Sequence, residues 1–216
     1  KPNDPDVLPI TEAMAISARN YHDLIVPAGQ DKISDDLRDF NRMGIVAPLP
    51  LLLAVKEAEP TQFDDALAVV SSLIVRNVIT SEISPNTYEK KWSEWAIKVR
   101  SKEIGWLKVR SNICEEIVDD KLFTDKFVSK QFKKTAETRY LLRKIEFHQM
   151  FDRLPSHVID VEHVLPKSIA TIWAESKKPT RKSNQWASDM GGSLPLGTLE
   201  AKKLASVVNL IGNQTL

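Results

Sequence analysis

Apolar residues recur every three or four positions through the first 150 residues of the chain. The clearest stretch has apolar residues at Phe63, Leu67, Val70, Leu73, Ile74 and Val78. Two further sets continue the pattern: Tyr88, Trp92, Trp95 and Val99, and then Ile104, Leu107, Ile113 and Ile117. This spacing puts apolar side chains on one face of a helix, so it predicts packed helices over residues 1–150. No run of 18 apolar residues occurs, and no membrane-spanning segment is expected.

Capping residues and prolines divide this region into separate helices. We expect Thr11 to cap a helix that runs to Ile25, and Ser34 to cap one that ends at Gly44. Further helices are expected to begin near Pro48, Pro85 and Thr135.

A single cysteine, Cys114, excludes an internal disulfide and a Cys-x-x-Cys zinc site. It lies among apolar helix positions and is expected to be a small core residue. This cysteine usage fits a reducing compartment, and we expect a cytoplasmic protein.

Charge is distributed unevenly along the chain although its formal net charge is only +1. Residues 1–86 hold 7 Lys and Arg against 13 Asp and Glu, a net charge of −6. Residues 87–153 hold 16 against 11, and residues 154–216 hold 7 against 5. A polyanionic partner is therefore expected to meet the later two-thirds of the chain, although solvated helix surfaces show similar blocks.

The pattern changes after Pro155, where β-branched residues replace the helical spacing. Residues 157–166 read as a strand that runs into a turn at Pro166, and residues 207–211 read as a second strand that closes at Gly212-Asn213. We therefore expect a helical domain at 1–150 and a small second domain at 151–216.

Glu162 and His163 are adjacent near the end of the first predicted strand. A carboxylate is a hard oxygen ligand for a divalent cation, and an imidazole is a base with a pKa near neutrality. Hydrolysis of a phosphodiester uses both, because the cation neutralises charge on the phosphate while the imidazole takes a proton from the attacking water. Neighbours on a strand point to opposite faces, so a bend is needed for both to serve one site. The alternative is a hairpin whose histidine only hydrogen-bonds a backbone carbonyl.

The segment Glu162-His163-Val164-Leu165-Pro166 resembles the first motif of the HNH, or His-Me finger, nucleases, which has the form acidic-His-hydrophobic-hydrophobic-Pro. Asn213-Gln214-Thr215-Leu216 resembles the second motif, an Asn followed by Leu-x-Leu. More narrowly, three stretches are similar to the C-terminal nuclease region of the GmrSD-type modification-dependent (type IV) restriction enzymes: RYLLRKIE at 139–146, DVEHVLP at 160–166 and VVNLIGNQTL at 207–216. Three upstream stretches are similar to the helices that precede the nuclease in that family: PLLLAV at 50–55, LIVRNVIT at 73–80 and DKFVSKQF at 125–132.

The resemblance implies a role for each motif residue. His163 would be the general base, Glu162 a metal ligand, and Asn213 the residue that ties the finger together and helps to orient the base. Asn209 is a competing candidate for that third role, because a strand places positions 209 and 213 on one face. The cation would be Mg²⁺, with Mn²⁺ as the alternative.

The resemblance also implies parts that the sequence does not contain. The family couples an N-terminal nucleotide-hydrolysing domain to the nuclease, and no phosphate-binding loop occurs in these 216 residues. The finger is built as strand, strand and helix, and the helix normally supplies a further metal ligand. Since the chain stops at Leu216, we expect a finger truncated at its C-terminal end that is inactive or holds metal weakly.

The sequence thus predicts a mainly α chain, a helical connector followed by an incomplete ββα-metal finger. Its expected function is metal-dependent endonuclease cleavage of DNA, including modified foreign DNA, in a phage-defence restriction system. Four basic residues between the two motifs are candidates for contacts with DNA phosphates, and a solvated loop is the alternative: Lys177, Lys178, Arg181 and Lys182. The main alternative is a non-catalytic helical DNA-binding or interaction module with a degenerate finger, and RNA cleavage would use the same chemistry. The sequence indicates no oligomeric state.

Overall fold

The structure is a computed structural model that describes residues 7–150, 162–163 and 214–215. The chain divides into two compact units, Lys1–Phe127 and Val128–Leu216. This division differs from the predicted domain boundary at 150/151 in placing the last helix with the second unit.

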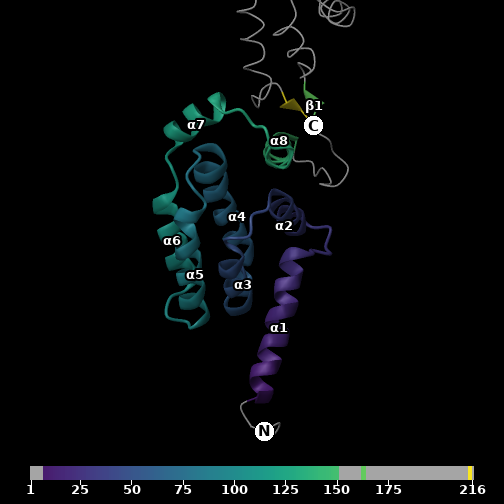
Figure 1. The fold of residues 1–216 in the computed structure, drawn as a ribbon, viewed down its shortest axis with the longest axis vertical. Coiled ribbons are helices and arrows are strands. Elements are labelled where there is room, and N and C mark those ends of the chain that lie inside the picture. The colour runs from purple at the N-terminus through teal and green to yellow at the C-terminus, as the bar shows by residue number, and fades with distance from the viewer. Residues whose placement is uncertain (1–6, 151–161, 164–213, 216) are drawn as a thin grey trace, which may run out of the picture. The chain divides into compact units, whose positions relative to one another are not determined.

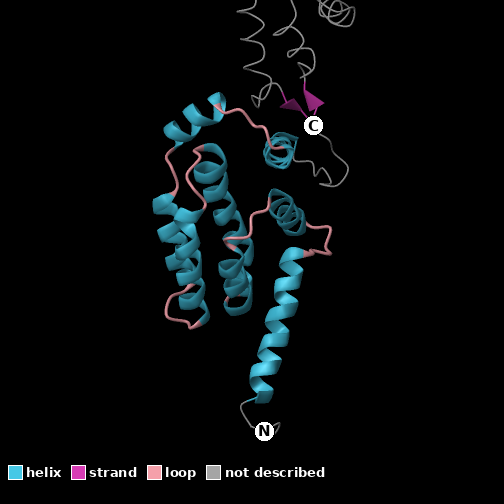
Figure 2. Cartoon of the chain, in the orientation of Figure 1, coloured by secondary structure: helices cyan, strands magenta, loops and turns pink. Residues whose placement is uncertain are grey.

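The described residues are mainly helical, as the apolar spacing predicts (Figure 2). The helices of the first unit are α1 (Val7–Ile25), α2 (Lys32–Met43), α3 (Leu49–Ala58), the 3₁₀ turn η1 (Pro60–Gln62), α4 (Phe63–Leu73), the π-helix η2 (Ile74–Thr80), α5 (Asn86–Arg100) and α6 (Trp106–Glu116). Helix α7 (Asp120–Ser129) carries the chain into the second unit, which contains α8 (Thr135–Met150) and the strands β1 (Glu162–His163) and β2 (Gln214–Thr215). None of the helices in these described ranges is long and apolar enough to cross a bilayer.

Helix α3 lies at the centre of the first unit. It packs against α1, α4 and α5, and α4 packs in turn against α6 (Figure 1). Three α3 side chains, Leu51, Leu52 and Val55, are fully buried. The expected apolar stripe of α4 and that of α5 are buried at Leu67, Val70, Trp92 and Val99. The helical spacing therefore identifies most of the core correctly.

Helix α1 is attached to this core by few side chains. Leu24 is fully buried, whereas its other described side chains are half-buried or exposed. The exposed apolar residues of the helix include Leu8, Ile10, Met14, Ile16 and Tyr21. The predicted cap at Thr11 is wrong, because the helix already begins at Val7 and the Thr11 hydroxyl donates to the Leu8 carbonyl inside it.

Helix α2 is capped at both ends by the residues that flank it, Asp31 and Gly44. Gly44 ends it as predicted, with φ of 70° and its N–H bonded to the Asn41 carbonyl. The predicted cap at Ser34 is wrong, because Asp31 caps the helix and the Ser34 N–H donates to the Asp31 carboxylate at 2.8 Å. Asp31 has extended backbone, so its carboxylate reaches back over the first turn, where helix N–H groups have no partner within the helix.

The first turn of α6 is held by residues from distant parts of the chain. The Glu59 carboxylate accepts a hydrogen bond from the Trp106 backbone N–H at 2.8 Å, and the Asp65 carboxylate accepts from the Trp106 indole at 2.6 Å. Trp106, Val109 and Ile113 form the buried face of this helix.

Two expectations for α6 are corrected. Leu107 is expected to pack but is 69% exposed. The buried face of the helix consists of Ile113 and of the residues four and seven positions before it, Val109 and Trp106. Cys114 follows Ile113 and therefore points away from this stripe; it is exposed rather than a core residue.

Candidate functional site

The two predicted motifs meet as paired strands. Strand β1 consists of Glu162 and His163, and it pairs in antiparallel orientation with β2, which consists of Gln214 and Thr215. In this register His163 is opposite Gln214 and Glu162 is opposite Thr215. Residues about fifty positions apart in the sequence are thus neighbours in one ribbon.

The register assigns each of these residues to a face of the ribbon. Opposite residues in an antiparallel pair share a face, and successive residues alternate between faces. His163 and Gln214 therefore share one face, and Glu162 and Thr215 share the other. Asn213 directly precedes β2 in the sequence.

The strands differ in extent from those expected from the sequence. Strand β1 falls within the expected strand at 157–166, whereas β2 starts after Gly212-Asn213, where the second strand was expected to close. The expected strand at 207–211 lies outside the described residues. So do six predicted site residues: Lys177, Lys178, Arg181, Lys182, Asn209 and Asn213.

Within the part of the chain that the structure describes, no group of three or more His, Cys, Asp or Glu side chains is placed to hold a metal ion. Two histidines outside the motif, His22 and His148, are exposed. Trp92 and Trp106 are fully buried side chains of the core.

A second polar site, which the sequence does not predict, lies inside the first unit. Asn77 of η2 is fully buried. Its side-chain amide donates to the Tyr88 hydroxyl at 2.8 Å and to the Glu116 carbonyl at 2.6 Å, and its side-chain oxygen accepts from the Val118 N–H at 2.9 Å. Both N–H donors and the oxygen of this side-chain amide therefore have hydrogen-bond partners, as a buried amide requires.

Arg76 extends the same site to the start of α7. Its guanidinium donates twice to the Val118 carbonyl, at 3.1 and 2.8 Å, and once to the Asp120 carboxylate at 2.6 Å. The guanidinium carbon lies 4.7 Å from the centre of the Phe123 ring. Together Arg76 and Asn77 fix the link between α6 and α7; the only sequence signal for this is a polar pair inside an apolar run.

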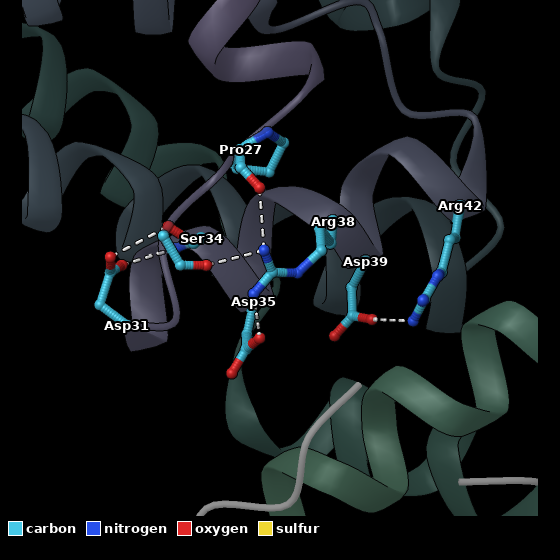
Figure 3. A network of polar contacts seen from close by, with 8 residues as sticks. Pro27, Asp31, Ser34, Asp35, Arg38, Asp39 and Arg42 are labelled. Carbon is cyan, nitrogen blue, oxygen red and sulfur yellow. Dashed lines mark hydrogen bonds and ion pairs between the residues drawn. The ribbon is translucent and has the colours of Figure 1, made fainter. Parts of the chain in front are cut away.

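The acidic residues of α2 form a third polar cluster (Figure 3). Asp35, Asp36 and Asp39 are buried. Arg38 donates to Asp35 at 2.6 Å and to the backbone carbonyls of Pro27 and Gly29, while Arg42 lies 3.7 Å from Asp39. The two ion pairs lie within α2, and the hydrogen bonds from Arg38 to Pro27 and Gly29 tie the helix to the segment before it, so the contacts of Asp35 and Asp39 have a structural explanation.

Hydrogen bonding lowers the pKa of the Asp31 carboxyl below its ordinary value. The Ser34 backbone N–H is the main cause, burial opposes it, and the Ser34 hydroxyl, 3.0 Å away, adds to the lowering. A carboxyl whose pKa is lower in the folded state stabilises the fold above its unfolded pKa, and this contribution is lost as pH falls through the folded pKa.

Asp31→Ala is expected to lower the free energy of unfolding by about 1 kcal/mol near neutral pH, because the helix loses its N-cap. The difference from the unmodified protein should shrink in acid, where Asp31 itself is protonated. Urea unfolding of both proteins, at neutral pH and in acid, measures this difference in stability. Asp31→Asn is the matched control, since asparagine caps equally well and should keep most of the stability at neutral pH. Equal stability of Asp31→Ala and the unmodified protein near pH 7 would contradict the assignment of the cap.

Comparison with known proteins adds no relatives: no protein-family model matches the chain, and neither a curated protein nor a solved structure does.

Proposed function

We propose that residues 151–216 belong to a metal-dependent endonuclease of the His-Me finger type that hydrolyses DNA phosphodiester bonds. The helical residues before them would connect this nuclease to an upstream regulatory domain. The biological setting would be restriction of modified foreign DNA.

The observation that carries the proposal is the pairing of the two motif strands. A one-site mechanism needs Glu162-His163 and the Asn213 segment close together, and the antiparallel pairing of β1 with β2 supports this. The register puts Glu162 and His163 on opposite faces of this ribbon, so the proposal also requires a bend that brings both side chains to one site.

Each residue has a distinct role in the proposed reaction. His163 would take the proton from the attacking water as general base. Glu162 would hold the Mg²⁺ or Mn²⁺ ion, whose charge stabilises the leaving oxygen. Asn213 would hold the finger together so that the imidazole stays in place, with Asn209 as the alternative.

The test is a cleavage assay with the full-length protein. It is incubated with Mg²⁺ and duplex DNA, with or without modified cytosines, and in parallel with RNA of the same sequence; a further arm contains excess chelator. Cleavage of DNA that requires the cation supports the proposal. DNA binding without cleavage in all arms indicates the non-catalytic module instead, and cleavage of RNA alone would reassign the substrate.

The basic residues between the motifs provide a prediction about binding. Replacing Lys177, Lys178, Arg181 and Lys182 together by Gln should reduce the slope of log affinity against log salt by about 3 to 4, because each phosphate contact contributes about 0.9. Fluorescence anisotropy with a labelled duplex at several salt concentrations measures this slope.

The control removes the same number of charges from the helical unit. Lys90, Lys102, Lys108 and Lys121 are exposed there, and their replacement by Gln should leave the slope nearly unchanged. If both quadruple variants reduce the slope equally, DNA affinity depends on the total charge of the protein. The four residues between the motifs would then not be the site of the phosphate contacts.

A further inference from the structure

The helix that follows α4 changes its winding in the middle of the first unit. Residues Ile74–Thr80 form a seven-residue π-helix, in which the Ser81 N–H bonds to the Arg76 carbonyl five residues back. π-Helical turns are rare, and their backbone hydrogen bonds span five residues instead of the four of the α-helix. The turn ends at Glu82, a non-glycine residue with φ of 59°.

The π winding changes which side chains face the core. Ile79, five residues after Ile74, is buried, whereas Val78, four residues after it, is only half-buried. In an α-helix the order would be reversed, because positions four apart share a face. Valine and isoleucine are both aliphatic and β-branched, so the sequence can fill the core position in either winding.

The two windings differ in their polar contacts. The π-helix buries the Thr80 hydroxyl, which has no hydrogen-bond partner among the described residues. A buried hydroxyl without a partner costs free energy. The same winding presents Asn77 and Arg76 to the link between α6 and α7, where they make five of the hydrogen bonds given above. The sixth joins Asn77 to the Tyr88 hydroxyl of α5. The hydrogen bonds to the link therefore offset the cost at Thr80.

We propose that Ile74–Thr80 is a two-state register switch. While Arg76 and Asn77 bind the link at Val118, the segment is π-helical and buries Ile79. When the link leaves, the segment rewinds as an α-helix that buries Val78 and turns Thr80 outward. Because α7 continues from this link into the second unit, displacement of α7 and rewinding of η2 become one coupled event, and each biases the other equally.

Thiol labelling distinguishes the two windings. Cys114 is exposed and is first replaced by Ser. Val78→Cys and Ile79→Cys are then made separately in that background, and the rate of reaction with a soluble disulfide reagent is measured for each. In the otherwise unmodified protein the thiol at position 79 should be the slower of the two.

Adding Asn77→Ala should accelerate labelling at position 79 by about tenfold or more and slow it at position 78, since the population moves towards the α winding. Val118→Pro provides a second variant that leaves the switch segment untouched: it removes the N–H that Asn77 accepts, and Ile117 before it already has the extended backbone that a proline requires. Like Asn77→Ala, it should speed labelling at position 79 and slow labelling at position 78.

Asn86→Ala, at an exposed position on α5, is the control and should change neither rate. Faster labelling at both positions would mean that the variants merely unfold the segment. Unchanged rates in both variants would mean that the winding does not depend on the link. Either result overturns the proposal.

Discussion

The His163→Ala protein is expected to lose DNA cleavage by about 10²- to 10⁴-fold while it binds DNA as tightly as before. Under the proposed mechanism the imidazole acts only on the attacking water, so its removal leaves the phosphate contacts and the cation in place. The measurement is a single-turnover cleavage rate at saturating protein, together with the binding affinity by anisotropy. Saturation separates the loss of the base from any loss of binding.

Two histidines serve as controls for this prediction. His148 is exposed on α8, and His157 precedes His163 by six residues; replacing either by Ala should leave the rate nearly unchanged. If His163→Ala cuts at the unmodified rate, His163 is not the base. If His157→Ala instead abolishes cleavage, the base has been assigned to the wrong histidine.

Trp106→Ala is expected to lower the free energy of unfolding by about 3 to 5 kcal/mol, the range found when a large buried aromatic side chain is removed. Trp106 is fully buried, so its deletion leaves a cavity between α6 and the helices packed on it. It also leaves the Asp65 carboxylate without the indole donor, although Arg110 remains 3.2 Å away. Denaturant unfolding followed by circular dichroism measures the change.

The neighbouring residue is the matched control. Leu107→Ala removes an apolar side chain of the same helix, but one that is 69% exposed, and should change the stability by less than about 0.5 kcal/mol. A larger loss for Leu107→Ala than for Trp106→Ala would mean that α6 packs in the register expected from the sequence and not in the one described here.

The part of the fold that sequence predicts well is the part governed by local rules. Gly44 ends α2 because glycine adopts positive φ without a steric penalty, and that rule can be applied to the sequence alone. The buried stripe through Leu67 and Val70 follows from helical spacing. Asp31 and Ser34 both have capping side chains, and only the backbone geometry decided between them.

The errors arise where distant contacts override local preference. Val78 fits the α-helical pattern, yet Ile79 is buried because hydrogen bonds to a link some forty residues away favour the π winding. Leu107 and Trp106 are both apolar, but only the tryptophan has an indole N–H that bonds to Asp65 of α4, and it is the buried one of the two. At the candidate site, the motifs identify Glu162 and His163, but the register that places His163 opposite Gln214 has no counterpart in the sequence pattern.

The sparse attachment of α1 has a consequence for how the molecule opens. Helix α1 buries little beyond Leu24, and its other contacts are polar: Asp23 pairs with Lys56 at 3.0 Å, and Ser17 accepts a hydrogen bond from Arg100. In α3, by contrast, Leu51, Leu52 and Val55 are fully buried, so this helix is expected to open only with the whole unit. We therefore expect the backbone amides of α1 to exchange with solvent faster than those of α3.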